Sequence, residues 1–249
     1  MTSTPLTTSL EDWLHGDAEI IAQNKEALGD GWTVGATFLE LHSRALETIS
    51  ARYGGNATPQ ERAILFLGIH ALNLATVAMR MAVCGNFDTV PYLFRALMDC
   101  HSLIQGCSRD ADLAERFLDG EEKLAGSARR KFITELQEAG YLDDAKWIEK
   151  RFLADYDAGN DLAHIGATQV RRVIEEGNGR LEPRLGGRAN ADEASLAWAA
   201  TLEQEHWALI WLNSVVADEA WSADFAAAQR LFTPFMARVS PPTDKEDNP

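Results

Sequence analysis

The sequence predicts an all-α protein, and three observations support this fold class. Apolar residues recur at helical spacing over most of the 249-residue chain. Short loops rich in glycine, asparagine or proline, such as residues 29–31 and 54–59, separate the periodic stretches. The periodicity weakens near residues 169–186, where the turn Gly177-Asn178-Gly179 lies between two short runs and favours a small β-hairpin.

Two helices are expected in an N-terminal extension, residues 1–58. The first runs to about Leu28 with Ser9 as its cap, and the second runs from about Trp32 to Tyr53. Each has an apolar stripe, so the extension should pack against the rest of the chain.

The stretch from Pro59 to Cys84 predicts the most buried helix, because it is apolar nearly all round. Thr58 precedes it as N-cap, and Glu61 can reach back to complete a capping box. Its polar residues include His70, Asn73 and Arg80. We therefore expect a core helix rather than a membrane span.

The helix expected over residues 86–108 organises the fold around it. Asp88 or Thr89 can cap this helix, and Pro91 fits its first turn without losing a hydrogen bond. The polar groups embedded in its apolar face are Arg95, Asp99 and His101. The first two are i,i+4 neighbours that can form an ion pair.

Further helices complete the predicted main domain, residues 59–239. They are expected at residues 110–118, 121–139, 143–156, 192–218 and 223–239. Pro234 should bend the last of them. The composition of residues 240–249 predicts a disordered tail.

Charge, cysteine content and the N-terminal composition indicate which kinds of function and location to expect. The formal net charge of −15 argues against broad, nonspecific binding to polyanions, while a local basic patch stays compatible with it. The three cysteines, Cys84, Cys100 and Cys107, lie in apolar stretches without a CxxC motif, so reduced and buried thiols are expected. The N-terminus lacks the basic and apolar segments of a secretory signal, and we expect a cytoplasmic protein.

The sequence has no P-loop, GxSxG or HExxH motif and no GxGxxG after a strand. The remaining candidates for catalytic or binding residues are polar side chains of the helices. Two clusters stand out: Arg95, Asp99 and His101 in one helix, and Asn160, Asp161 and His164 in the run GNDLAH. An arginine beside a histidine suits phosphodiester cleavage, since the guanidinium stabilises phosphate charge while the imidazole transfers a proton. The structural alternative is a helix ion pair, with the histidines hydrogen-bonded in the core.

A metal site is a weaker alternative. Asp161-x-x-His164 and Glu203-x-x-His206 each place a carboxylate and an imidazole at i,i+3, as in carboxylate-bridged di-metal bundles. Candidates for further ligands are Glu40, Glu47 and Asp99. Such short matches arise readily in a chain rich in acidic residues, so we expect a protein without a cofactor.

Basic residues gather in the hairpin-like segment and could contact RNA locally. They are Arg171, Arg172, Arg180, Arg184 and Arg188, with Arg129, Arg130 and Lys131 on a preceding helix. The alternative is a solvated hairpin whose arginines pair with Glu175, Glu176 and Glu182.

One run resembles a known superfamily. In LNLATVAMRMAVCGNFDTVPYLFRALMDCHSLIQGCSRDADLAERFLDG, an apolar helix and a turn precede an R-x-x-x-E/D helix and a segment like DLAERFL. This arrangement resembles uncharacterised bacterial members of the HEPN superfamily (higher eukaryotes and prokaryotes nucleotide-binding). The likeness covers roughly Ala63 to Thr168 and implies a HEPN-like helical bundle.

The resemblance implies a metal-independent ribonuclease that acts as a homodimer, often in defence or stress response. The superfamily signature is an arginine with a histidine four to six residues further on, usually with a polar residue between. GNDLAH has Gly159 in place of the arginine, RALMDCH offers Arg95 and His101, and a third option combines Arg95 with His164. In the active version the resemblance implies that Arg95 holds the phosphate, His164 is the acid/base group, and Asn160 orients either the 2′-hydroxyl or the histidine.

Asp99 stands at the acidic position of the R-x-x-x-E/D motif, which implies a structural pairing role for Arg95. The alternative function is therefore a non-catalytic helical interaction or dimerisation module, whose polar cluster only fixes packing.

Overall fold

The computed structural model describes residues 18–52, 57–150, 174–177, 180–183, 187 and 189–239. In these residues the chain is an all-α bundle, as the sequence predicts, with one short hairpin. The elements are α2 (Ala18–Leu28), α3 (Asp30–Ala51), α4 (Pro59–Val83), η1 (Phe87–Thr89), α5 (Val90–Arg109), α6 (Ala111–Leu118), α7 (Leu124–Glu138), β1 (Ile174–Gly177), β2 (Arg180–Pro183), α10 (Ala191–Val216) and α11 (Glu219–Val239). Residues 142–150 are also helical.

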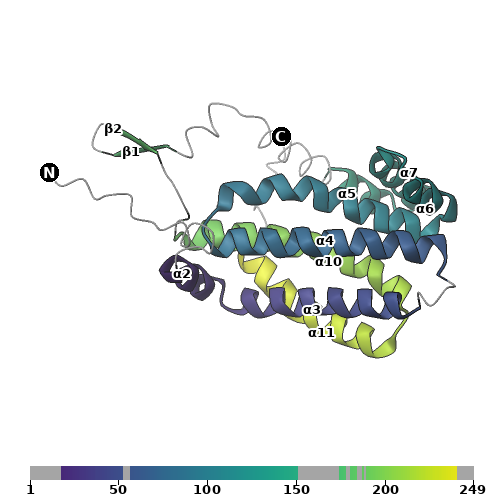
Figure 1. Cartoon of the computed structure of the whole chain (residues 1–249), viewed down its shortest axis with the longest axis horizontal. Coiled ribbons are helices and arrows are strands. Elements are labelled where there is room, and N and C mark those ends of the chain that lie inside the picture. The colour runs from purple at the N-terminus through teal and green to yellow at the C-terminus, as the bar shows by residue number, and fades with distance from the viewer. Residues whose placement is uncertain are drawn as a thin grey trace.

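The long helices form two layers. Helices α3, α4 and α5 run side by side along the long axis, and α10 and α11 lie behind them (Figure 1). Helix α10 packs against all three front helices, and α11 packs against α3 and α10. Helices α6 and α7 pack against α5 at one end of the bundle. This arrangement puts α5 between α4, α7 and α10, where its polar residues meet other helices.

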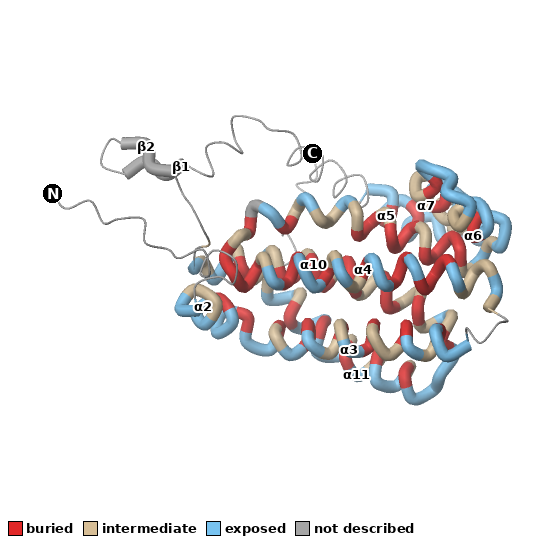
Figure 2. Tube along the Cα trace, viewed as in Figure 1, coloured by how far each residue is buried: buried red, intermediate tan, exposed pale blue. Residues whose placement is uncertain are grey.

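A large hydrophobic cluster fills most of the bundle, beside a small second one between α4 and α5. The large cluster runs from Leu28 at the end of α2 to Phe235 in α11, and buried residues line the inward sides of the helices (Figure 2). The helices of the predicted N-terminal extension therefore share their core with the main domain. Among the described residues, the largest fully buried side chains include Phe38, Leu97, Met98 and Leu202.

Local signals set most helix boundaries. The predicted capping box is confirmed, because the Thr58 side chain accepts from the Glu61 amide while the Glu61 carboxylate accepts from the Thr58 amide. Gly29, at φ +50°, ends the first helical stretch, and α3 begins at once at Asp30, two residues earlier than predicted. Helix α11 begins at Glu219, four residues earlier than predicted, since the Asp218 carboxylate caps the Trp221 amide at 2.8 Å.

Helix α4 is long and apolar enough to cross a membrane, by length and composition, with a mean hydropathy of 1.6 over its most apolar window. No other helix among the described residues passes that test. In the bundle it packs against α3, α5, α6 and α10. Its outward face is mixed, with Arg62, His70 and Arg80 exposed beside apolar side chains.

The predicted hairpin is confirmed in a shorter form. Strands β1 and β2 pair antiparallel, with Ile174 opposite Pro183 and Gly177 opposite Arg180. The predicted tail, residues 240–249, lies outside the described residues.

The cysteines are free and buried, as expected. Burial raises the pKa of both Cys100 and Cys107 to about 12, so neither thiol is ionised at neutral pH.

Candidate functional site

Helix α5 begins differently from the prediction. A 3₁₀ turn, η1, precedes it, and Thr89 becomes its N-cap residue in a helical conformation (φ −86°, ψ −29°). The Thr89 side chain makes no capping hydrogen bond, because the cap needs an extended backbone to reach the next turn. Pro91 lies in the first turn, as predicted.

Asp99 pairs with a different arginine from the predicted one. Its carboxylate accepts from the Arg129 guanidinium of α7 at 3.3 Å, and Arg129 also donates to the Ser102 hydroxyl at 3.3 Å. Arg95, exposed one turn before Asp99, acts on it through its charge. Burial nevertheless raises the pKa of Asp99, against the opposing effect of both arginines. The Asp99 carboxylate thus links α5 to α7, whereas the prediction was an ion pair within α5.

His101 lies in the core and not beside Arg95. Six helical residues rotate a side chain to about 120° from its starting direction, so the exposed Arg95 and the buried His101 lie on different faces. Burial first, and then the charges of His42 and Arg129, lower the pKa of His101 to about 3. His101 is therefore neutral and enclosed, which does not suit a proton donor to a bound phosphodiester.

A second polar pair lies deeper in the core. His42 of α3 contacts the Glu205 carboxyl of α10 through Nδ1, and both side chains are fully buried. His42 Nε2 points toward α4, where a Cβ at Gly68 would lie 3.5 Å from it. The sequence interpretation missed this pair, although Leu202, Glu205 and Leu209 share a helical stripe. An acidic residue within an apolar helical stripe, here Glu205, is the sequence signal that could have identified the pair.

His101 and the Arg129–Ser102 contact border a small cavity of about 20 Å³, enough for one water molecule. His101, Ser102, Gln105 and Arg129 supply its polar lining. Its apolar lining comes from Phe132, Ile148, Trp207 and Trp211. This polar core thus links α5, α7 and α10 around His101.

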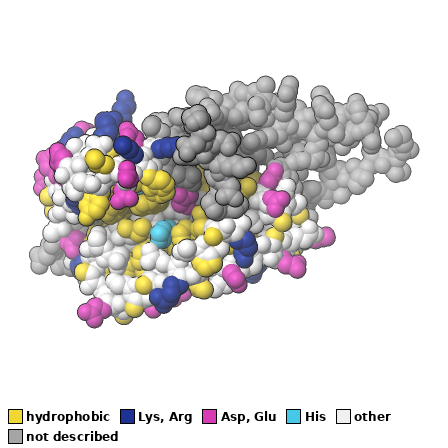
Figure 3. Space-filling model, turned by 180° about the vertical axis from the view of Figure 1, so that it is seen from behind, with side chains coloured by type: hydrophobic (Ala, Val, Ile, Leu, Met, Phe, Trp, Pro, Cys, Tyr) yellow, Lys and Arg dark blue, Asp and Glu magenta, His cyan; other side chains and the backbone are white. Residues whose placement is uncertain are grey.

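His206 is a partly buried histidine among aromatic side chains. It stacks against Phe38 and packs against Phe225 and Phe232, and a ring nitrogen lies 2.9 Å from the Gln229 amide. Burial lowers its pKa to about 4. Figure 3, the face opposite to that of Figure 1, shows hydrophobic side chains gathered around a histidine.

No group of three or more metal-ligating side chains occurs among the described residues, which include Glu203 and His206. The other two residues of the weak metal alternative, Asp161 and His164, lie outside those residues.

Several predicted site residues are not placed by the structure. Those outside the described residues are Asn160, Asp161, His164, Arg171, Arg172, Arg184 and Arg188. Arg180 lies on β2, where only the backbone is described. The predicted pairing of Arg95 with His164 therefore stays a prediction.

No family model matches the chain, and neither the curated proteins nor the solved structures contain a match. The likeness to the HEPN superfamily remains a prediction from the motifs of α4 to α6.

Proposed function

We propose that the chain is a HEPN-related, ribonuclease-like or RNA-associated cytoplasmic protein that acts as a homodimer. The observation that carries this proposal is the pair of arginines around Asp99. Arg95 is exposed on α5, and Arg129 of α7 is held on the Asp99 carboxylate. Guanidinium groups on the neighbouring helices α5 and α7 supply paired N–H donors of the kind that suit an RNA phosphate.

In this proposal Arg95 holds the phosphate, and Asp99 positions the arginines. His164 supplies the acid/base group that α5 lacks, with Asn160 orienting it or the 2′-hydroxyl. His101 takes no part, because it is enclosed and neutral. The hairpin arginines provide further RNA contacts outside the cleavage site.

The test is an RNA cleavage and binding assay on the full chain, with and without EDTA. We expect EDTA-insensitive cleavage that is lost in Arg95→Ala and in His164→Ala. Two matched controls are Arg62→Ala and His70→Ala, which remove an exposed arginine and an exposed histidine from α4. Cleavage that survives in both test variants, or a wild type that neither cleaves nor binds RNA, contradicts the proposal.

A second candidate is a non-catalytic helical interaction module, and the position of His101 favours it. The described residues place the histidine of α5 in the core, where it borders a packed polar network rather than an open site. The cleavage assay separates the two functions. A protein that forms dimers but leaves RNA intact and unbound supports the interaction module.

A further inference from the structure

A groove between α3 and α4, which we name the apolar groove, has a volume of about 310 Å³. Its lining residues are Trp32, Ala36 and Leu39 of α3, Thr76, Met79, Arg80 and Val83 of α4, and Trp198 of α10. All of them except Thr76 and Arg80 are apolar. Ala36 is exposed, and Trp32 and Leu39 are partly exposed. Apolar surface that lines a groove in this way is typical of a binding site for another apolar surface.

The floor of the apolar groove is fixed by Trp198. This side chain is only 3% exposed, and its ring stacks on Trp32 with the centroids 5.4 Å apart. Its indole N–H donates to the Gly31 carbonyl at 2.8 Å. Gly35 makes room for the ring, since a Cβ there would lie 2.4 Å from it. Binding in the groove therefore needs no rearrangement of its floor, and its driving force is the removal of apolar surface from water.

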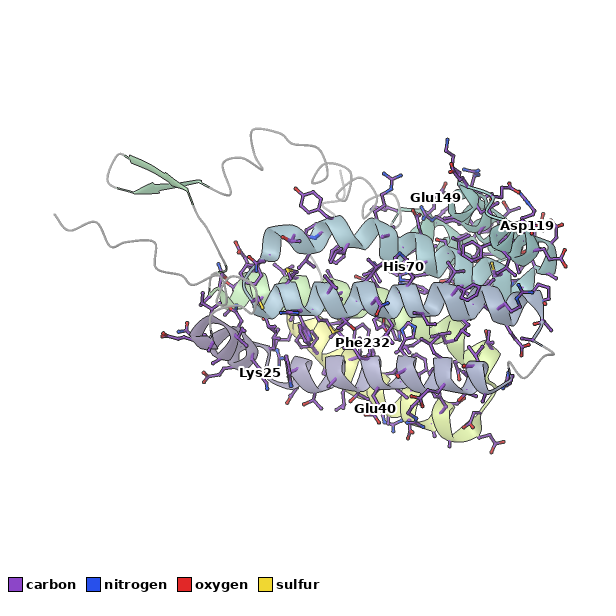
Figure 4. The ribbon with its side chains drawn as sticks, in the orientation of Figure 1. Lys25, Glu40, His70, Asp119, Glu149 and Phe232 are labelled. Carbon is purple, nitrogen blue, oxygen red and sulfur yellow. The ribbon has the colours of Figure 1, made fainter. Side chains whose placement is uncertain are left out.

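Helix α2 borders the apolar groove. Lys25 Nζ lies 4.2 Å from the ring centroid of Trp32, and Figure 4 shows Lys25 at the α2 end of α3. The described part of α2 begins at Ala18, and residues 1–17 lie outside the described residues. The segment that precedes α2 in the sequence therefore joins the fold close to this groove.

That segment contains an apolar stripe in the run SLEDWL, residues 9–14. Leu10, Trp13 and Leu14 have the spacing i, i+3 and i+4, so a helical turn puts them on one side. The same turn puts Glu11 and Asp12 on the other side. Such a turn has one face suited to an apolar groove and one suited to water.

The distance is short enough for the segment to fold back. Seven residues separate Ala18 from Lys25, which is about 10 Å along a helix. The four residues from Leu14 to Ala18 span up to about 13 Å when extended. Gly16 lies between them, and glycine permits the bend that a return along α2 requires.

Other stretches outside the described residues suit the apolar groove less. Residues 240–249 contain no large apolar side chain, and residues 184–186 contain only that of Leu185. Residues 151–173 begin at a different part of the bundle, because Ile148 lines the cavity between α5, α7 and α10. Position and composition together favour residues 9–14.

We propose that residues 9–14 fold back over the apolar groove of their own chain and place Trp13 and Leu14 between α3 and α4. The docked segment covers the open side chains of the groove and excludes other ligands from it. This contact goes beyond the proposed RNA function and does not depend on it.

The first test is cross-linking of the full-length protein with a short bismaleimide. Leu14→Cys with Ala36→Cys should give a link within one chain. The matched control is Leu14→Cys with Ala227→Cys, since Ala227 is also exposed but lines a groove of about 290 Å³ on the other side of α3, against α11. This control and the wild type, whose three cysteines are buried, should give no link. Leu10→Cys replaces Leu14→Cys if that substitution alone releases the segment. A link between two copies, or equal linking to Ala36→Cys and Ala227→Cys, overturns the proposal.

The second test is a fluorescence titration with phenylnaphthylamine, an uncharged apolar probe. The full-length variant Leu10→Ser, Trp13→Ser, Leu14→Ser should bind one probe at least about tenfold more tightly than the wild type, because a tethered segment competes at a high effective concentration. Glu11→Ser with Asp12→Ser changes the other side of the turn and should behave as the wild type.

Groove-filling substitutions locate the probe. Ala36→Trp added to the triple serine variant should abolish the new binding, while Ala227→Trp should leave it unchanged. Thr76→Trp replaces Ala36→Trp if circular dichroism shows that protein to be unfolded. The proposal is overturned if the wild type binds the probe as tightly as the triple variant, which indicates an open groove. It is also overturned if the triple variant gains no binding, which indicates another occupant.

Discussion

At the scale of single residues, the unusual feature is a set of polar side chains inside an apolar bundle. His42 and Glu205 are fully buried, and the buried ring nitrogens of His101 have no hydrogen-bond partner within the described part of the chain. Such groups tolerate little change in their charge, because the interior solvates an ion poorly. Acidification and removal of a partner should therefore both be costly.

The first prediction concerns pH. The pKa of His101 is about 3 in the fold, against an ordinary value of 6.5, so below pH 6.5 the unfolded chain binds a proton that the folded chain does not. The stability contributed by neutral His101 is then present above pH 6.5 and is lost as the pH falls toward 3. Between pH 7 and pH 5 the free energy of unfolding should drop by about 2 kcal/mol from this residue.

Urea denaturation at the two pH values measures this loss. His101→Leu should remove about 2 kcal/mol of the pH dependence, while His70→Leu, at an exposed position, should keep it. An equal pH dependence in the wild type and His101→Leu would sink the prediction.

The second prediction concerns the His42–Glu205 pair. Glu205→Leu leaves His42 buried without its partner, and should lower the free energy of unfolding by about 3–5 kcal/mol. His42→Leu should have a comparable effect. The double variant replaces both groups by apolar ones and should lose clearly less than the sum of the single variants. Additive losses in the double-mutant cycle, measured with urea, would show that the contact contributes no coupling.

At the scale of elements, glycines set how closely the helices approach. A Cβ at Gly106 of α5 would lie 2.5 Å from Leu113 and 2.9 Å from Ala128, so α6 and α7 pack directly on its backbone. Gly126 of α7 has no such neighbour, its nearest atom being the end of Arg130 at 3.7 Å. The two glycines therefore provide a matched pair.

The third prediction follows from that pair. Gly106→Ala should destabilise the fold by about 1–3 kcal/mol, because a well-packed contact has to open. Gly126→Ala should stabilise it by about 0.5–1 kcal/mol, because alanine restricts the unfolded chain and favours the helix. Thermal unfolding of both variants checks the signs, and a stabilising Gly106→Ala would contradict the packing described for α5.

The sequence predicted the helices and their boundaries better than it predicted which side chains pair across helices. Periodicity and caps located α4 within one residue of its observed end, since the Thr58–Glu61 signal is local. The partner of Asp99 is 30 residues away on another helix, and Glu205 is 163 residues from His42. Helical spacing says which face a residue occupies, and not which side chain of another helix meets it. For this reason Arg95–Asp99 was expected as the pair, while Arg129 was expected on a basic surface.

At the scale of the whole molecule, the outer face of α4 bears on the proposed homodimer. Phe66, Ile69 and Val77 lie on that face at helical spacing and are 52%, 45% and 44% exposed. A row of large apolar side chains on one open helix face is typical of an interface. A second copy of the chain would cover these side chains.

The fourth prediction tests this face by light scattering after size-exclusion chromatography. The wild type should elute as a dimer at micromolar concentrations, and Phe66→Glu with Val77→Glu should elute as a monomer, because the interface cannot bury two unpaired carboxylates. The control is Leu231→Glu, which changes an exposed leucine of α11. A wild type that is monomeric at every concentration tested would refute the homodimer.

Trp198 has a consequence for how the layers can move. Its ring fits over Gly35 and its indole N–H is bonded to the Gly31 carbonyl, so one side chain of α10 meets α3 at two successive turns. Sliding α3 along α10 by one turn would break that bond, and in one of the two directions it would also bring Leu39 against the ring. The contacts of Trp198 therefore fix the position of α3 along the axis of α10. Its fluorescence should consequently report the separation of the front and back layers when the protein unfolds.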